Sequence, residues 1–216
     1  ADALGLAEAY GDMPADPLRD DPFDVPIWRP SGEHDPAWPS PWGWGRPGWH
    51  AECAAMAAAT LGSSVDVLVG GEDLAFPHHA YQAAMVEAAV SVGPFARRML
   101  HVGEVSQGGS KMAKSTGNLT LVADLLETAP AAAIRLMLLD RRWFERWEYR
   151  PELLEAVTGK LHDLYAAASR PGASEAAEQE VGAALLDDLD VPRALAVATE
   201  AGGAAGRLLI RVLSLG

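Results

Sequence analysis

Four side chains that can bind soft metal ions occur in two short stretches of the chain. Cys53, the only cysteine among 216 residues, follows His50 by three positions, and His78 and His79 come next to each other later. Residues three apart on a helix share one face, and zinc accepts both thiolate sulfur and imidazole nitrogen. Adjacent helical side chains point about 100° apart. The spacing therefore predicts a zinc site that uses Cys53 and one of the two adjacent histidines.

These residues also have ordinary structural roles. A lone cysteine is often a small buried hydrophobe, and histidines at the start of a helix can bond to backbone carbonyls. Spacing alone leaves both interpretations open. One cysteine cannot form an internal disulfide, so we expect a reducing compartment, the cytoplasm.

Two further stretches suit a phosphorylated ligand. Gly109–Asn118 contains Lys111 and Lys114, whose ammonium groups could neutralise charge that develops on phosphoryl oxygens. Gly70–Asp73 follows a strand pattern, where glycines let a ligand approach the backbone and Asp73 could accept from ribose hydroxyls. A solvated surface loop and an ordinary turn are the structural alternatives.

Helix and strand patterns alternate through the middle of the chain. The predicted helices are 49–61, 78–91, 119–127 and 130–139, and the predicted strands are 65–69 and 99–103. This alternation predicts an α/β fold, half of a doubly wound Rossmann-like sheet. In such sheets ligands bind outside the carboxyl ends of the strands, where the glycines and histidines fall.

The two ends of the chain have different patterns. Residues 1–48 are rich in Pro, Gly, Asp and Trp, and we expect loops there, apart from a short helix at 3–10. We expect these loops to be held by aromatic anchors: Trp28, Trp38, Trp42 and Trp44. From about residue 150 the pattern is helical, with Pro151 in a first turn. The first helix has an apolar face of Leu153, Leu154, Val157, Leu161 and Leu164, and further helices are predicted at 177–188, 191–201 and 203–214.

We therefore predict three domains. Residues 1–48 form a loop-rich connecting segment. Residues 49–140 form half of a Rossmann-like domain, which includes the loop with Lys111 and Lys114 (the lysine loop), and 141–216 form a helical bundle. The sequence begins at Ala1 rather than methionine, which indicates a processed chain or a fragment.

Composition restricts the classes of partner. The net charge of −13 argues against a large nucleic-acid interface, because phosphate contacts need clustered Lys and Arg. No apolar run approaches the ~18 residues of a membrane span, and the N-terminus lacks a basic-then-apolar targeting pattern. We expect small-molecule substrates, and neither a membrane nor a nucleic acid as partner.

Three motifs occur in order, at the spacing of one family. Pro39–Cys53 resembles the second half of a cysteinyl-tRNA synthetase, and so do Gly70–His79 and the lysine loop, Lys111–Ser115. The resemblance covers about residues 5–200. It implies the second half of a class I synthetase-type Rossmann domain, followed by a helical bundle.

One branch of this family, the mycothiol cysteine ligases, is more similar than the others. These enzymes use ATP to join cysteine to glucosaminyl-inositol. A tRNA synthetase would continue into an anticodon-binding domain, whereas this sequence ends at Gly216, soon after Asp187–Pro192. Glu8–Met13 partly matches the ligases' Glu-Arg-Gly-Gly-Asp-Pro motif. Gln82 replaces a synthetase zinc-ligand glutamate, which fits the ligase branch.

The resemblance implies a role for each matching residue. Cys53 and His78 match zinc ligands of the family. Nucleotide or adenylate contacts are matched by Trp49, Gly71, Glu72, Asp73 and Val105, and by Lys111, Met112, Ala113, Lys114 and Ser115 of the lysine loop. Among them Asp73 is the ribose acceptor, and Lys111 and Lys114 are catalytic.

The sequence also departs from the family pattern. Val69 replaces a glycine, Ala113 replaces a serine, and Glu72 replaces a small residue near the adenylate. The family's first half carries another zinc cysteine and an ATP motif of the His-Ile-Gly-His type, and neither is matched here. We expect the N-terminal half of the site on the same or another chain.

The resemblance implies an ATP-dependent ligase that activates cysteine as an adenylate and transfers it to the amine of an amino sugar. AMP and pyrophosphate are the products, zinc is the cofactor, and Mg²⁺ accompanies ATP. A cysteinyl-tRNA synthetase fragment is one alternative. A non-catalytic synthetase-like module for binding or assembly is another, which the substitutions at Val69, Glu72 and Ala113 slightly favour.

Overall fold

The computed structural model describes Pro17 and residues 19–216. The chain divides into two compact units between Val102 and Gly103. The helix expected at 3–10 and the Glu8–Met13 stretch lie outside the described residues. Among the described residues, no helix is long and apolar enough to cross a bilayer.

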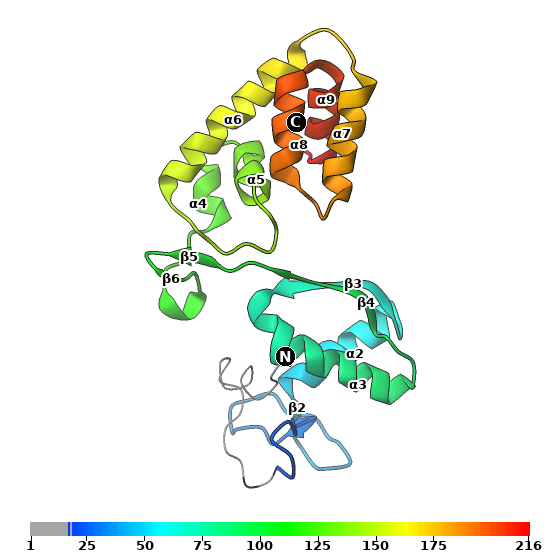
Figure 1. Ribbon diagram of the computed structural model, residues 1–216. Coiled ribbons are helices and arrows are strands. Elements are labelled where there is room, and N and C mark those ends of the chain that lie inside the picture. The colour runs from blue at the N-terminus through cyan, green and yellow to red at the C-terminus, as the bar shows by residue number, and fades with distance from the viewer. Residues whose placement is uncertain (1–16, 18) are drawn as a thin grey trace. The chain divides into compact units, whose positions relative to one another are not determined.

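The first unit is built on two parallel strands. β3 (Val65–Gly71) pairs with β4 (Ala96–Val102), with Val65 opposite Ala96 and Gly71 opposite Val102. The helices α2 (Trp49–Leu61) and α3 (Ala80–Val90) pack against each other beside these strands (Figure 1). Their small core consists of Ala54, Val86, Phe95 and Ala96. Strand–helix–strand order is therefore as predicted, with β4 beginning three residues earlier than expected.

The connection between β3 and α3 carries most of the candidate site. A 3₁₀ turn, Glu72–Leu74, and a wider helical turn, Ala75–His79, come before α3. Because α3 begins at Ala80, both adjacent histidines lie in this turn rather than in the helix. Both are buried.

Residues ahead of α2 form an antiparallel pair of short strands, β1 (Trp28–Arg29) and β2 (Arg46–Pro47). The predicted aromatic anchors are mostly wrong. Trp38, Trp42 and Trp44 are 53%, 74% and 71% exposed, and only Trp28 is half-buried. A tight turn, in which Ser40 and Gly43 exchange backbone hydrogen bonds, is closed instead by the backbone pairing of residues 38 and 45.

The second unit begins with a small sheet. β5 (Val105–Gln107) pairs antiparallel with β6 (Ser110–Lys111) and parallel with β7 (Trp147–Glu148). A 3₁₀ turn, Lys114–Thr116, follows β6. The lysine loop is therefore the end of a hairpin strand and the turn after it.

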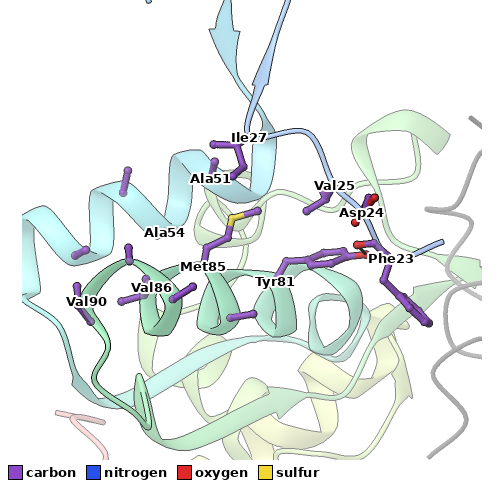
Figure 2. A pocket seen from close by; sticks show the side chains of 15 residues that line it. Phe23, Asp24, Val25, Ile27, Ala51, Ala54, Tyr81, Met85, Val86 and Val90 are labelled. Carbon is purple, nitrogen blue, oxygen red and sulfur yellow. Dashed lines mark hydrogen bonds between the residues drawn. The ribbon is translucent and has the colours of Figure 1, made fainter. Parts of the chain in front are cut away.

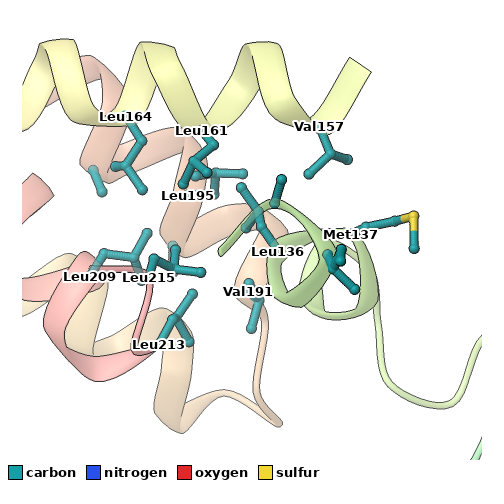
Figure 3. Close-up of a cluster of buried hydrophobic side chains, with 14 of the residues drawn as sticks. Leu136, Met137, Val157, Leu161, Leu164, Val191, Leu195, Leu209, Leu213 and Leu215 are labelled. Atoms are coloured by element: carbon teal, nitrogen blue, oxygen red, sulfur yellow. The ribbon is translucent and has the colours of Figure 1, made fainter. Parts of the chain in front are cut away.

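Helices make up the rest of the second unit. They are α4 (Val122–Leu126), α5 (Ala131–Leu139), α6 (Pro151–Ser169), α7 (Glu175–Leu186), α8 (Val191–Ala201) and α9 (Gly203–Val212). Figure 3 shows leucines of α6, α8 and α9 meeting Leu136 and Met137 of α5 in one core. The predicted apolar face of α6 is confirmed, since Leu154, Val157, Leu161 and Leu164 are buried and Leu153 packs beside them.

The packing units differ from the predicted domain limits. α5 was placed before the predicted boundary at residue 140, but its Ala133, Ile134, Leu136 and Met137 belong to the core of the helical unit. Apolar spacing within α5 shows that one face is buried, yet it does not show which neighbour buries that face. The domain limits stay a prediction.

Candidate functional site

Aromatic rings from α2 and the turn before α3 form a compact cluster. The Nδ1 atoms of His50 and His78 lie 2.8 Å apart, and both histidines are buried. The Trp49 ring stacks on the His78 ring, with 4.3 Å between centroids and 17° between planes. The ring of Tyr81 lies 5.0 Å from that of His50. Trp49 is still 54% exposed, so part of it faces solvent.

The short contact between His50 and His78 requires a matching pair of tautomers, because one Nδ1 must donate and the other accept. When His78 is the donor, its Nε2 keeps a lone pair, which is the tautomer that a metal ligand needs.

A second histidine pair lies next to the first. His79 Nδ1 is 2.9 Å from His101 Nε2, and the two belong to the turn before α3 and to the end of β4. Burial, His101 and His78 together hold the pKa of His79 below its usual value, against an opposing effect of Asp73. A Cβ on Gly70 would lie 2.6 Å from Cε1 of His79, so glycine is needed for this close approach.

Cys53 is half-buried on α2, three residues beyond His50. Its thiol and the imidazole of His78 are of the donor types that zinc prefers. Within the described residues, however, no three histidine, cysteine, aspartate or glutamate side chains gather to hold a metal ion. Catalytic zinc sites use three protein ligands. The residues present therefore fit zinc in type but not in number.

The turn after β3, where nucleotide contacts were predicted, differs from a simple open glycine turn. Glu72 and Asp73 form the 3₁₀ turn after β3, and Gly71 is the last residue of that strand. A Cβ on Gly71 would lie 2.5 Å from Oδ1 of Asp73. Glycine at position 71 therefore leaves room for the carboxylate of Asp73, which is the predicted ribose acceptor.

The lysine loop is partly covered along its backbone and open at its charged ends. Met112 and Ala113 are half-buried, whereas Lys111, Lys114 and Ser115 are exposed. The N–H of Met112 donates to the carbonyl of Val105 at 2.8 Å, which continues the hairpin. Lys111 Nζ lies 3.9 Å from a Glu104 carboxylate oxygen, a long and partly exposed contact of little energetic weight.

Glu148 fastens the turn of the β5–β6 hairpin. Its Oε1 accepts the N–H of Gly109 at 3.0 Å, and its Oε2 accepts from Arg150 Nε at 3.1 Å. The bond from Arg150, followed by that from Gly109, lowers the pKa of Glu148. The turn that leads into the lysine loop is thus held by a side chain from β7.

With this geometry established, the chain can be compared with known proteins. The family model described as the tRNA synthetases class I (C) catalytic domain matches residues 8–159. The chain belongs to this family.

Two curated proteins are similar to this chain over most of its length. The "L-cysteine:1D-myo-inositol 2-amino-2-deoxy-alpha-D-glucopyranoside ligase" of Frankia casuarinae is 41% identical over 95% of the chain and 47% of its own length. A "Cysteine--tRNA ligase" of Caulobacter sp. is 44% identical over 83% of the chain and 40% of its own length. The chain therefore spans about half the length of the curated relatives that it matches.

Solved structures support the fold of the class I synthetase family. The agnB2 LeuRS of Agrobacterium radiobacter K84, in a ternary complex with tRNA and LeuAMS, matches with a TM-score of 0.54 and 16% identity. That match covers 83% of the chain and 32% of LeuRS, and at this identity it concerns the fold alone. The predicted fold class is confirmed.

The predicted site residues of this synthetase domain fall into two groups. Trp49, Cys53, Gly71–Asp73 and His78 lie in the first unit, and Val105 and the lysine loop lie in the second. Within the first unit the structure brings Trp49 against His78, and within the second it bonds Met112 to Val105.

Some residues of this site were not predicted. His101 pairs with His79, and Glu148 fastens the hairpin turn. A sequence signal exists for His101, because it lies within the strand predicted at 99–103; the structure places it opposite Gly70 in the parallel register. No local pattern connects Glu148 with Gly109, which precedes it by 39 residues.

The first unit also has an apolar groove between α2 and α3. It has a volume of about 730 Å³ and is lined by small apolar side chains of α2 and α3 together with Phe23, Tyr81 and Met85. Figure 2 shows it between the two helices. No histidine lines it, and Tyr81 is the residue that the groove shares with the ring cluster.

Proposed function

We propose that the chain forms part of an ATP-dependent ligase that activates cysteine as an adenylate and transfers it to the amine of an amino sugar. The observation that carries the proposal is the stack of Trp49 on a histidine pair, one helical turn from Cys53 and next to the end of β3. In open α/β sheets this is where ligands bind. Similarity to relatives named as ligases of cysteine with an aminodeoxyglucopyranoside supports this substrate class.

Cysteine recognition is assigned to the first unit. Cys53 and His78 would hold a zinc ion, with further ligands from the N-terminal half or from substrate. A zinc ion supplies selectivity, because a thiolate is a better zinc ligand than a serine hydroxyl. His50 fixes the ring of His78, on which Trp49 stacks. Trp49 would contact the cysteinyl adenylate.

ATP contacts are proposed in each unit taken by itself. Asp73 accepts from the ribose hydroxyls next to Gly71, and the backbone of Val105 meets adenine. The cysteine carboxylate attacks the α-phosphate and pyrophosphate leaves, with Mg²⁺ accompanying the phosphates. Lys111 and Lys114 offset the charge that develops on the phosphoryl oxygens. The amine, as free base, then attacks the adenylate carbonyl; an amide forms, AMP leaves, and the amine loses a proton.

We further propose that the N-terminal half of the site lies on the same or another chain, and that the enzyme works in the cytoplasm. The small number of zinc donors among residues 19–216 and the coverage of about half of each relative support the first point. A negative charge of −13 supports a small-molecule acceptor over a nucleic acid.

A cysteine–tRNA ligase is the second candidate, favoured by the 44% identity to a relative of that name. Cysteine-dependent ATP–pyrophosphate exchange by the protein with both halves present would establish activation. Adding glucosaminyl-inositol or tRNA then distinguishes the acceptors by which one releases AMP in the presence of cysteine. AMP release with tRNA alone would replace the proposal by the second candidate, and no exchange at all would favour a non-catalytic module.

A further inference from the structure

The side-chain amide of Asn118 bonds to both sides of the lysine loop. Its Oδ1 accepts the N–H of Ala113 at 3.0 Å, and its Nδ2 donates to the carbonyl of Lys111 at 3.1 Å. Nδ2 also lies 3.4 Å from the carbonyl of Gln107 and 3.5 Å from that of Ser110. One half-buried side chain therefore connects the loop to both strands of the β5–β6 hairpin.

Only an amide satisfies these partners. A backbone N–H can only donate and a carbonyl can only accept, so the site needs one acceptor atom and one donor group on the same planar side chain. The environment thus fixes which way the amide of Asn118 points. Aspartate has the same shape but no donor, and it would place a charged oxygen against the carbonyl of Lys111.

The turn before Asn118 is shaped to return this side chain to the loop. Gly117 has φ +69°, in the left-handed region that favours glycine. Thr116 adds to the same arrangement, because its hydroxyl lies 2.5 Å from Oδ1 of Asn118 and 2.8 Å from the carbonyl of Ala113.

We propose that Asn118 is a positioning residue that sets the conformation of the lysine loop. Its side chain holds the backbone of Lys111, which is one of the two lysines, and that of Ala113, which directly precedes Lys114. Holding the backbone on both sides of Met112 limits how far Lys111 and Lys114 can move apart. The catalytic consequence rests on the proposed function, since pre-organised cations stabilise developing charge without a cost of reorganisation. The conformational consequence does not rest on the proposed function.

Limited trypsin digestion of the chain tests the conformational role, because trypsin cuts after Lys111 and Lys114. Asn118→Asp keeps the shape and removes the donor. The matched control is Thr120→Val, which removes only a side-chain bond from Thr120 to Gln107. Losing bonds worth about 1 kcal/mol or more predicts cleavage at the two lysines roughly 5- to 20-fold faster in Asn118→Asp, and unchanged in the control.

Cleavage after Lys160, within α6, serves as the internal reference. Equal acceleration at Lys160 would mean that Asn118 only supports the fold, and no acceleration at the lysines of the loop would mean that it does not hold the loop. Either result overturns the proposal. Should Asn118→Asp fail to fold, Asn118→Ala and hydrogen exchange at the Ala113 amide decide instead. An unprotected Ala113 amide in the parent chain would also refute it.

With both halves of the enzyme present, Asn118→Asp should lower kcat of cysteine-dependent exchange about tenfold and leave KM for cysteine unchanged. An unchanged kcat would refute the catalytic consequence. A parent enzyme without any exchange would refute the proposed function, while the digestion result would still decide the role of Asn118.

Discussion

Replacing Gly70 by alanine is a sharp test of the histidine arrangement. The new Cβ would lie 2.6 Å from Cε1 and 3.0 Å from Nε2 of His79, and 3.1 Å from Cδ1 of Leu74. His79 cannot simply rotate away, because its other nitrogen bonds to His101 at 2.9 Å and its ring is buried. Either the strand shifts or the histidine pair separates.

The magnitude follows from these two costs. Inserting a methyl group into a packed site costs about 1–3 kcal/mol. Loss of the bond between His79 and His101 adds about 1 kcal/mol. We therefore expect Gly70→Ala to destabilise the first unit by about 2–4 kcal/mol. Native-state hydrogen exchange at amides of β3 and β4 measures that unit by itself, so unfolding of the helical unit does not confuse the result.

Gly159→Ala is the matched control. Gly159 lies within α6, and a Cβ there would meet no atom within 4 Å. The same substitution should therefore stabilise α6 by about 0.5–1 kcal/mol, the opposite sign. A change below about 0.5 kcal/mol in the first unit of Gly70→Ala would refute the reasoning, because it would mean that His79 has room to move.

Three further predictions concern the proposed function. Cys53→Ala should lower the zinc content found by elemental analysis, and an unchanged stoichiometry would remove Cys53 from the ligand set. The double variant of Lys111 and Lys114 to alanine should slow cysteine-dependent exchange by about 10²–10³, whereas an unaffected rate would make the lysine loop a surface turn. The chain alone should associate in light scattering, because β3 pairs with β4 alone among the described strands and exposes Val67 and Val69. A stable monomer with full adenylation activity would contradict that last expectation.

Local pattern was enough to predict the regular elements around the site. Helix 49–61 was predicted with the limits that α2 has, because a long run of alanines between two glycine-containing stretches has strong start and stop signals. The strand predicted at 65–69 extends to Gly71, since glycine can continue a parallel ladder even though it weakens the pattern. The helix predicted at 78–91 starts two residues later, after a wide turn that has no simple periodic signal.

Contacts within the site were harder to predict than its elements. His50 and His78 are 28 residues apart, and His79 and His101 are 22 apart, so their pairing depends on strand register and on how α2 packs on α3. For Trp42 and Trp44 a contact was predicted that the structure does not have, because both side chains are exposed. Their size suggested burial, but the tight turn at Ser40–Gly43 is closed by backbone and hydroxyl bonds and needs no aromatic packing.

Each part of the candidate site is organised by contacts within its own unit. In the first unit the imidazoles of His50 and His78 bond to each other beneath Trp49, and in the second Asn118 and Glu148 bond to the backbone of the lysine loop and its turn. Both sets of bonds join groups of the chain itself, so their formation needs no ligand. Binding energy then need not be used to order these groups, which is the condition under which fixed charges and rings accelerate a reaction. It follows that Gly70→Ala and Asn118→Asp, which disturb different units, should have additive effects on stability.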